Sequence, residues 1–329
     1  MSSGTTPAPA ENDVWARIRG LGTELTPEML GGSRALFEPL VHRPGPDVVV
    51  HRDVMYGPDP RHRLDIFVPA AGVARAAVVV FVHGGGFIMG DKGAPDAPFY
   101  NNVGLWAARS GCIGVTMTYR LAPGATWPAG SEDAGAAVRF LGSSVQKYGG
   151  DPNRIFLMGQ SAGAVHVAGY VAMAGGGIAG AMLISGIYDV ARAERNPFQA
   201  AYYGEDPARF AEQSTLTKLA ETSLPCFVCV SEFDPPDFQR QAAWLHKSAL
   251  ALAEGTPLSS LLEGGYPRLH FSRRAAVETA LRNFNPARLI AIIDQLATAA
   301  LDMRKQPSLA AVIAQRTLLS IAVNAKRRG

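Results

Sequence analysis

The segment from Ile155 to Tyr188 contains no Asp, Glu, Lys or Arg. A charge-free segment of this length is long enough to cross a bilayer. However, glycines interrupt it at Gly159, at Gly163 and at 175–177, and polar side chains lie within it. Strands of a parallel sheet are buried on both faces and form continuous apolar runs. We therefore expect a buried strand–helix–strand core here and no membrane span.

Strand and helix patterns alternate along most of the chain. Short apolar or alternating runs predict strands at 47–57, 62–70, 75–83, 112–120, 154–159, 178–186, 224–232 and 257–264. Helical patterns lie at 97–111, 131–150, 161–173 and 235–255. Ser131 is the expected N-cap of the second helix, and Gly149 is expected to end it. This alternation predicts an α/β fold, with a mostly parallel twisted sheet covered by helices on both faces.

The two ends of the chain differ from this pattern. Residues 1–45 contain short helical patterns broken by Pro and Gly, so we expect a small N-terminal helical cap or arm there. We assign the sheet domain to 46–272 and a helical C-terminal extension to 273–329. From residue 265 onward the chain has 11 Lys and Arg against 3 Asp and Glu. A solvated helical tail explains this charge, and contact with nucleic acid or an anionic membrane is the alternative.

Composition limits the cellular context and the partners. The net charge of +3 is too small to predict a nucleic-acid partner for the whole chain. The first residues lack the basic and apolar regions of a secretion signal. The three cysteines are an odd number, and Cys226 and Cys229 lie in an apolar run rather than at a helix start. We interpret both as strand residues, with a redox role as the alternative. The odd count and the lack of a secretion signal fit a cytoplasmic protein, with a homodimer left open.

One serine stands on a turn between a predicted strand and a predicted helix. The sequence from Gly159 to Gly163 fits the pattern G-x-S-x-G, with Ser161 at its centre. A strand that turns sharply into a helix leaves no room for side chains beside the serine, so glycine is needed there. The helix that follows directs its first N–H groups at developing negative charge. We interpret Ser161 as a nucleophile; the alternative is a glycine-rich turn with a chance serine.

A run of glycines follows another buried strand. His83 begins the sequence HGGGF, and the three glycines let N–H groups approach a reacting group closely. We expect the N–H groups of Gly84, Gly85 and Ala162 to bind the oxyanion formed when an ester carbonyl is attacked. A phosphate-binding loop needs a Walker lysine or G-x-G-x-x-G opening a helix, and neither is present. His83 is expected to brace the loop.

Together these motifs resemble the α/β-hydrolase superfamily, in its hormone-sensitive-lipase-like carboxylesterase branch. The matching stretches are HGGGFIMGDK, YRLAPGATWPAGSEDA, GGDPNRIFLMGQSAGA and SEFDPPDFQ. The resemblance covers about residues 45 to 272 and implies the α/β-hydrolase fold. It also implies a catalytic triad in the chain order serine, acid, histidine.

That order selects the acid and the base. Asp234 follows the predicted strand at 224–232 and precedes a proline, as in the family's D-P turn, while Glu232 and Asp237 are lesser candidates. His270 lies 36 residues after Asp234 and is the expected base. The match departs from the family there: relatives usually have a glycine or polar residue close before this histidine, whereas here Tyr266, Pro267, Arg268 and Leu269 precede His270, and 59 residues follow it.

The resemblance implies a serine carboxylester hydrolase that acts on small, fairly apolar esters through an acyl-enzyme, without a metal or organic cofactor. We expect Phe87 and Trp127 to line the substrate pocket. An amidase of the arylformamidase type is close chemistry. A binding protein of the same fold that has lost a triad member is the non-enzymatic alternative.

Overall fold

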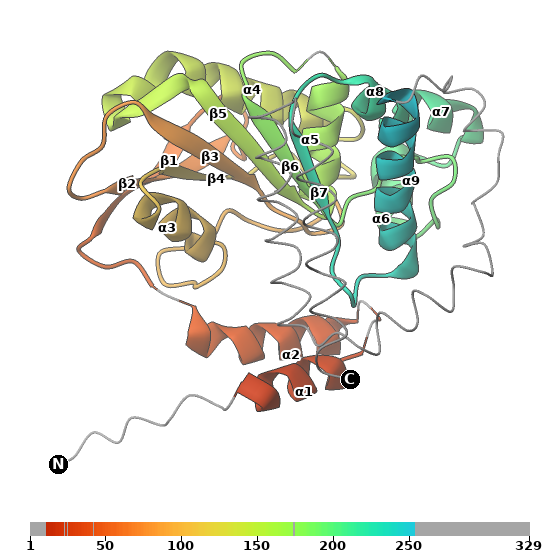
Figure 1. Ribbon diagram of the computed structural model, residues 1–329, viewed down its shortest axis with the longest axis horizontal. Helices are drawn as coiled ribbons and strands as arrows, with labels where there is room; N and C mark the ends of the chain where they lie inside the picture. Colours follow the sequence, from red (N-terminus) through yellow and green to blue (C-terminus); the bar gives the residue numbers. More distant parts are fainter. Residues whose placement is uncertain (1–10, 23, 25, 42, 174, 254–329) are drawn as a thin grey trace, which may run out of the picture. The chain divides into compact units, whose positions relative to one another are not determined.

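The strands of the described residues form one sheet in the order β1-β2-β4-β3-β5-β6-β7 (Figure 1). A computed structural model describes residues 11–22, 24, 26–41, 43–173 and 175–253 of the chain. The strands are β1 (Val48–Met55), β2 (Arg63–Pro69), β3 (Ala76–Val82), β4 (Ile113–Met117), β5 (Gly150–Gln160), β6 (Gly180–Ile184) and β7 (Cys226–Cys229). β2 pairs antiparallel with both β1 and β4, and the other neighbours are parallel. The prediction of a mostly parallel sheet is confirmed.

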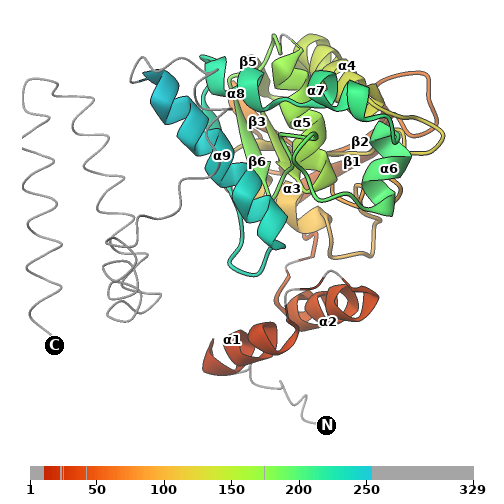
Figure 2. The same cartoon turned by 90° about the vertical axis from the view of Figure 1, so that its right-hand side faces the viewer.

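Helices separate most of the strands, as predicted. They are α1 (Glu11–Gly20), α2 (Pro27–Phe37), α3 (Asn101–Arg109), α4 (Ala129–Ser144), α5 (Ala162–Ala172), α6 (Pro197–Tyr203), α7 (Phe210–Gln213), α8 (Leu216–Glu221) and α9 (Pro236–Ala253). Short 3₁₀ turns occupy 38–40, 145–148 and 207–209. The sequence did not predict α6 to α8, which lie between β6 and β7 and are short. α8 packs against α5 and α9 (Figure 2).

Alternating side chains of the strands build a core on each face of the sheet. Ile66 of β2 belongs to the larger core, which also contains apolar side chains of α4, α5 and α8. The next residue, Phe67, packs on the opposite face with Leu105 and Ala108 of α3. Successive side chains of a strand point to opposite faces, so one strand serves both cores. Helices therefore cover both faces, as expected.

The start of α4 differs from the prediction. The helix begins at Ala129, two residues before Ser131, which is not the N-cap. Ser131 is 2% exposed, and a Cβ at Gly169 of α5 would lie 2.1 Å from its hydroxyl. The small serine instead allows α4 and α5 to approach closely. Gly149 has a φ of 85° and follows the 3₁₀ turn after α4, so the predicted end of the helical segment is confirmed.

Some predictions lie outside the described residues. These are the strand at 257–264 and the helical extension at 273–329. The division between an N-terminal arm at 1–45 and the sheet domain stays a prediction. Among the described residues, no helix is both long and apolar enough to cross a membrane.

Candidate active site

Ser161 occupies the bend between β5 and α5, as the sequence predicts. Its φ of 55° and ψ of −121° lie in a region that non-glycine residues rarely adopt. The N–H of Ser161 donates a 2.8 Å hydrogen bond to the carbonyl oxygen of Ile184, at the end of β6. Such strain costs about 1–3 kcal/mol and persists only where the surroundings hold the backbone in place. The serine is therefore fixed at the carboxyl ends of the parallel strands.

Close packing of the backbone explains both glycines of the bend. A Cβ at Gly159 would lie 2.3 Å from the carbonyl oxygen of Gly163. A Cβ at Gly163 would lie 2.0 Å from the carbonyl oxygen of Val82, the last residue of β3. Both distances are far shorter than an ordinary van der Waals contact, and both involve backbone atoms. The predicted steric reason for G-x-S-x-G is thus confirmed.

The glycine loop after β3 lies directly against the serine bend. A Cβ at Gly84 would lie 3.2 Å from the Cβ of Ser161. Gly85 has a φ of 130°, and a Cβ there would lie 2.0 Å from the carbonyl oxygen of Met89. Within the described part of the chain, the N–H groups of Gly84, Gly85 and Ala162 donate no backbone hydrogen bond outside regular elements. A helix leaves its first N–H groups unpaired, which applies to Ala162 at the start of α5, whereas Gly84 and Gly85 lie in the loop after β3.

His83 braces the glycine loop, as expected. Its Nδ1 lies 2.6 Å from the carbonyl oxygen of Gly84, and its ring stacks on Tyr119 with 4.3 Å between centroids. The hydroxyl of Tyr119 in turn donates to the carbonyl oxygen of His83 at 2.8 Å. Burial lowers the pKa of His83 to about 4. The ring is therefore neutral at physiological pH and donates from Nδ1 to Gly84.

A group of charges around the buried Lys92 and Asp65 holds the far end of the same loop. The Nζ of Lys92 lies 2.9 Å from carboxylate oxygens of both Asp53 and Asp65. Asp65 is fully buried and also binds Arg52 at 2.6 Å. Burial lowers the pKa of Lys92, but its hydrogen bonds to the two carboxylates outweigh that effect and raise the pKa. The lysine is therefore charged and ties the loop to β1 and β2.

Sequence analysis missed this charge cluster. Asp53 reaches Lys92 because β1 contains an irregularity between His51 and Val54, where Asp53 adopts a φ of 53°. A bulge of this kind redirects a side chain out of the regular alternation. The only signal available from the sequence was Lys92 itself, a cation in a loop of glycines and apolar residues.

Asp234 lies in the loop between β7 and α9. Its Oδ2 accepts hydrogen bonds from the Oγ of Ser185 at 2.5 Å and from the N–H of Ser231 at 2.7 Å. Ser185 follows β6, which pairs with β5, so Asp234 lies at the same edge of the sheet as Ser161. This is the edge at which α/β sheets place their ligands.

The two lesser candidates for the acid differ from Asp234. Glu232 is exposed. Asp237 is buried in the first turn of α9, where its carboxylate accepts from the N–H of Glu194 at 3.0 Å and from Arg240 at 3.3 Å. Asp237 therefore connects α9 to the loop after β6.

The predicted base, His270, lies outside the described residues. His166 is on α5, close to Ser161 in the sequence, but it is 1% exposed and surrounded by aromatic rings. Its Nδ1 lies 3.3 Å from the hydroxyl of Tyr202. Burial lowers the pKa of His166 to about 3, so this ring is a poor proton acceptor at neutral pH.

Aromatic side chains from α6 lie over the glycine loop. Phe87 is 4% exposed, and its ring stacks on Tyr202 at 4.5 Å between centroids. Trp127 is partly buried against the same cluster, and its backbone N–H donates to the carbonyl oxygen of Tyr202 at 2.9 Å. Phe198 is 43% exposed, and a Cβ at Gly86 would lie 3.1 Å from its ring. Phe198 is thus the exposed ring of this group, and sequence analysis did not single it out.

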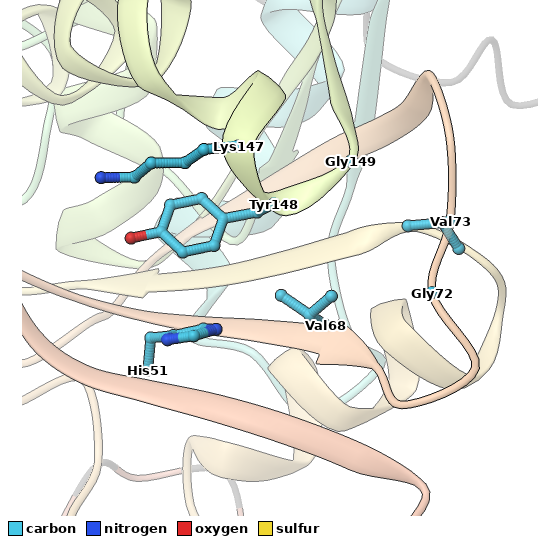
Figure 3. A pocket seen from close by; sticks show the side chains of 7 residues that line it. All are labelled: His51, Val68, Gly72, Val73, Lys147, Tyr148 and Gly149. Atoms are coloured by element: carbon cyan, nitrogen blue, oxygen red, sulfur yellow. The ribbon is translucent and has the colours of Figure 1, made fainter.

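Two hollows of the surface do not include Ser161 among their lining residues. One, of about 590 Å³, is lined by His51, Val68, Gly72, Val73, Lys147, Tyr148 and Gly149. Figure 3 shows Tyr148 between Lys147 and His51. The ring centroids of Tyr148 and His51 are 4.9 Å apart. Gly149 directly precedes β5, so this hollow lies near the amino end of that strand, away from Ser161. The second, of about 650 Å³, lies around Arg61 and Arg120. Among the described residues, no cluster of three or more His, Cys, Asp or Glu is arranged to hold a metal ion.

The sheet order, the serine on the bend after β5 and the glycine loop after β3 define the α/β-hydrolase fold. A family model described as alpha/beta hydrolase fold matches residues 79–249, and the chain belongs to this family. The expected membership of the superfamily is confirmed, and the named esterases among its relatives support the carboxylesterase branch.

The curated relatives are named esterases, and a solved structure shares the fold. Over 119 residues the chain is 40% identical to isoprenylcysteine alpha-carbonyl methylesterase ICME of Arabidopsis thaliana, covering 36% of this chain and 26% of that protein. Esterase LipQ of Mycobacterium tuberculosis is 29% identical over 238 residues, or 62% of this chain and 54% of that one. The chain thus spans about a quarter of the plant protein and about half of LipQ. The crystal structure of a phosphonate-inhibited esterase B from Lactobacillus rhamnosis superimposes with a TM-score of 0.57 at 20% identity, covering 75% of this chain and 82% of that one.

Proposed function

We propose that the chain is a serine carboxylester hydrolase that acts on small, fairly apolar esters through an acyl-enzyme. The observation that carries the proposal is the contact between the glycine loop and the serine bend, where a Cβ at Gly84 would lie 3.2 Å from the Cβ of Ser161. Free N–H donors beside a strained serine are what attack on an ester carbonyl needs. Both relatives are named esterases, which supports the same reaction class.

The residues of the triad carry out the proton transfer. A serine hydroxyl is a weak nucleophile at neutral pH, so His270 accepts the proton of Ser161 as its Oγ attacks the acyl carbon. Asp234 orients the imidazole and stabilises its cation. The alcohol then leaves with the proton from His270, and water hydrolyses the acyl-enzyme by the same route.

The oxyanion hole consists of the N–H groups of Gly84, Gly85 and Ala162. Each donor is fixed before the reaction, so no reorganisation is needed when charge develops on the carbonyl oxygen. One such donor contributes roughly 10²–10³ in rate. The bracing of the loop by His83 and Lys92 supports this role, because small displacements of a donor weaken its hydrogen bond.

The pocket for the acyl or alcohol group lies among the aromatic rings beside the glycine loop. Phe87 and Trp127 form its inner wall, and the exposed ring of Phe198 lies closest to solvent. An apolar wall of this kind favours small apolar groups. The plant relatives are named methylesterases, which supports esters of a small alcohol.

The cellular context belongs to the same proposal. All three cysteines, Cys112, Cys226 and Cys229, are free thiols, which supports a reducing, cytoplasmic environment. A homodimer stays a prediction.

A chromogenic short-chain ester tests the reaction class. We expect Ser161→Ala and His270→Ala to lower turnover by several orders of magnitude. Ser143→Ala is the matched control, because Ser143 is exposed on α4 and its hydroxyl donates only to the carbonyl oxygen of Phe140. Wild-type turnover in Ser161→Ala, or labelling of another residue by a fluorophosphonate, would refute the assignment of the nucleophile.

Matched ester and amide substrates distinguish the alternatives. An amidase of the arylformamidase type would hydrolyse the amide at a comparable rate. A binding protein of this fold would bind the ester without hydrolysing it, and His270→Ala would then change nothing.

A further inference from the structure

Ser185 stands at a second strained position of the same sheet edge. It directly follows β6 and has a φ of 56°, in the left-handed region that favours glycine. The residue is 4% exposed, and its N–H donates to the carbonyl oxygen of Cys229 at 2.9 Å. The preceding residue, Ile184, accepts the hydrogen bond from the N–H of Ser161 at 2.8 Å. Ser185 therefore lies beside the backbone that holds the serine bend.

In the described part of the chain, the hydroxyl of Ser185 has one partner, the carboxylate of Asp234. Its Oγ lies 2.5 Å from Oδ2 of Asp234, and the N–H of Ser231 reaches the same oxygen at 2.7 Å. Within the described segments, no donor lies on the other oxygen, Oδ1. One oxygen is thus held by two donors, and the other remains free to accept a further hydrogen bond.

We propose that Ser185 is a positioning residue that fixes the rotation of the Asp234 carboxylate and thereby keeps Oδ1 available as the acceptor for the triad base. This inference rests on the proposed function. A glycine would relieve the strained backbone at this position but would remove the hydroxyl. Serine occupies this φ although glycine would be unstrained there, which indicates that the hydroxyl has a function, its hydrogen bond to Asp234, that glycine cannot supply.

Ser185→Gly separates a role in catalysis from a role in stability. Glycine relieves the strain at a φ of 56°, so we expect a melting temperature close to that of the wild type despite the lost hydrogen bond. Without the hydroxyl the carboxylate rotates, so we expect kcat to fall about tenfold or more while KM changes less than about twofold. Arg75→Gly is the matched control, because Arg75 has a φ of 53° before the amino end of β3, and its kcat should stay unchanged.

A double-mutant cycle shows whether Ser185 acts through Asp234. In an Asp234→Asn background, Ser185→Gly should lower kcat no further. Unchanged kcat in Ser185→Gly, or an equal loss in both backgrounds, would overturn the role proposed for Ser185. If Ser161→Ala retained turnover instead, the serine hydrolase itself would be refuted, and the two failures are therefore distinguishable.

Discussion

Two helical glycines allow the packing of the serine bend to be tested directly. Gly163 is in the first turn of α5, where a Cβ would lie 2.0 Å from the carbonyl oxygen of Val82 and 2.6 Å from that of His83. Gly142 is on the exposed side of α4, where a Cβ would meet nothing within 4 Å. Both positions are helical, so the change to alanine brings a similar gain in helix propensity, up to about 1 kcal/mol. The difference between the two variants therefore isolates the steric effect.

The expected magnitude follows from these contacts. Gly142→Ala should stabilise the fold by about 0.5–1 kcal/mol. In Gly163→Ala, backbone atoms at the end of β3 must move by more than an ångström, and overpacking of this kind costs about 1–3 kcal/mol or more. Because the propensity gain is similar in both variants and cancels, the difference between them is the steric cost of about 1–3 kcal/mol or more, or at least ~2 °C in melting temperature.

Thermal unfolding and esterase turnover would be measured for both variants. Gly163→Ala should also lose turnover, because the same movement displaces Gly84 from Ser161. Gly142→Ala should keep the wild-type rate. Equal melting temperatures of the two variants, or an active Gly163→Ala enzyme, would show that the bend adapts to a side chain and that our steric argument is wrong.

Two further predictions concern buried charges and histidines. Lys92→Met leaves the buried carboxylate of Asp65 with one cation fewer, so we expect a loss of about 1–3 kcal/mol in unfolding free energy and a lower kcat. Asp47→Asn, in the exposed pair with Arg109, is the control and should change both quantities little. An unchanged kcat in Lys92→Met would contradict the role of Lys92 in the loop. His166 and His83 have pKa values lowered by burial to about 3 and about 4, so the unfolded chain binds protons that the folded chain does not as the pH falls below the usual histidine pKa. Stability should therefore fall with decreasing pH from about 6.5 toward about 4, by roughly 1.4 kcal/mol per pH unit for each histidine. The unfolding free energy of His166→Phe, measured with urea at both ends of this pH range, should change less with pH than that of the wild type, by about 1.4 kcal/mol per pH unit. An unchanged pH dependence would show that His166 is protonated in the folded protein.

The elements that local sequence determines were predicted well. Glycines at Gly159 and Gly163, with an apolar run before them and a helical pattern after, were sufficient to place Ser161 on a strand–helix bend. The glycines after His83 likewise located the loop that contacts it. These signals are local, since each depends on residues a few positions apart. The prediction for Ser131 was wrong because a neighbouring helix, not the local capping preference, determines its environment.

The sequence by itself determined the alternation of strands and helices, the serine bend and the glycine loop. Only the tertiary structure decided which side chains meet across the sheet edge. The hydrogen bond between Ser185 and Asp234 joins residues 49 positions apart, and the contacts of Lys92 with Asp53 and Asp65 depend on an irregularity in β1. Such contacts depend on the order and register of the strands, which are set by the packing of the whole sheet and leave no periodic pattern in the chain.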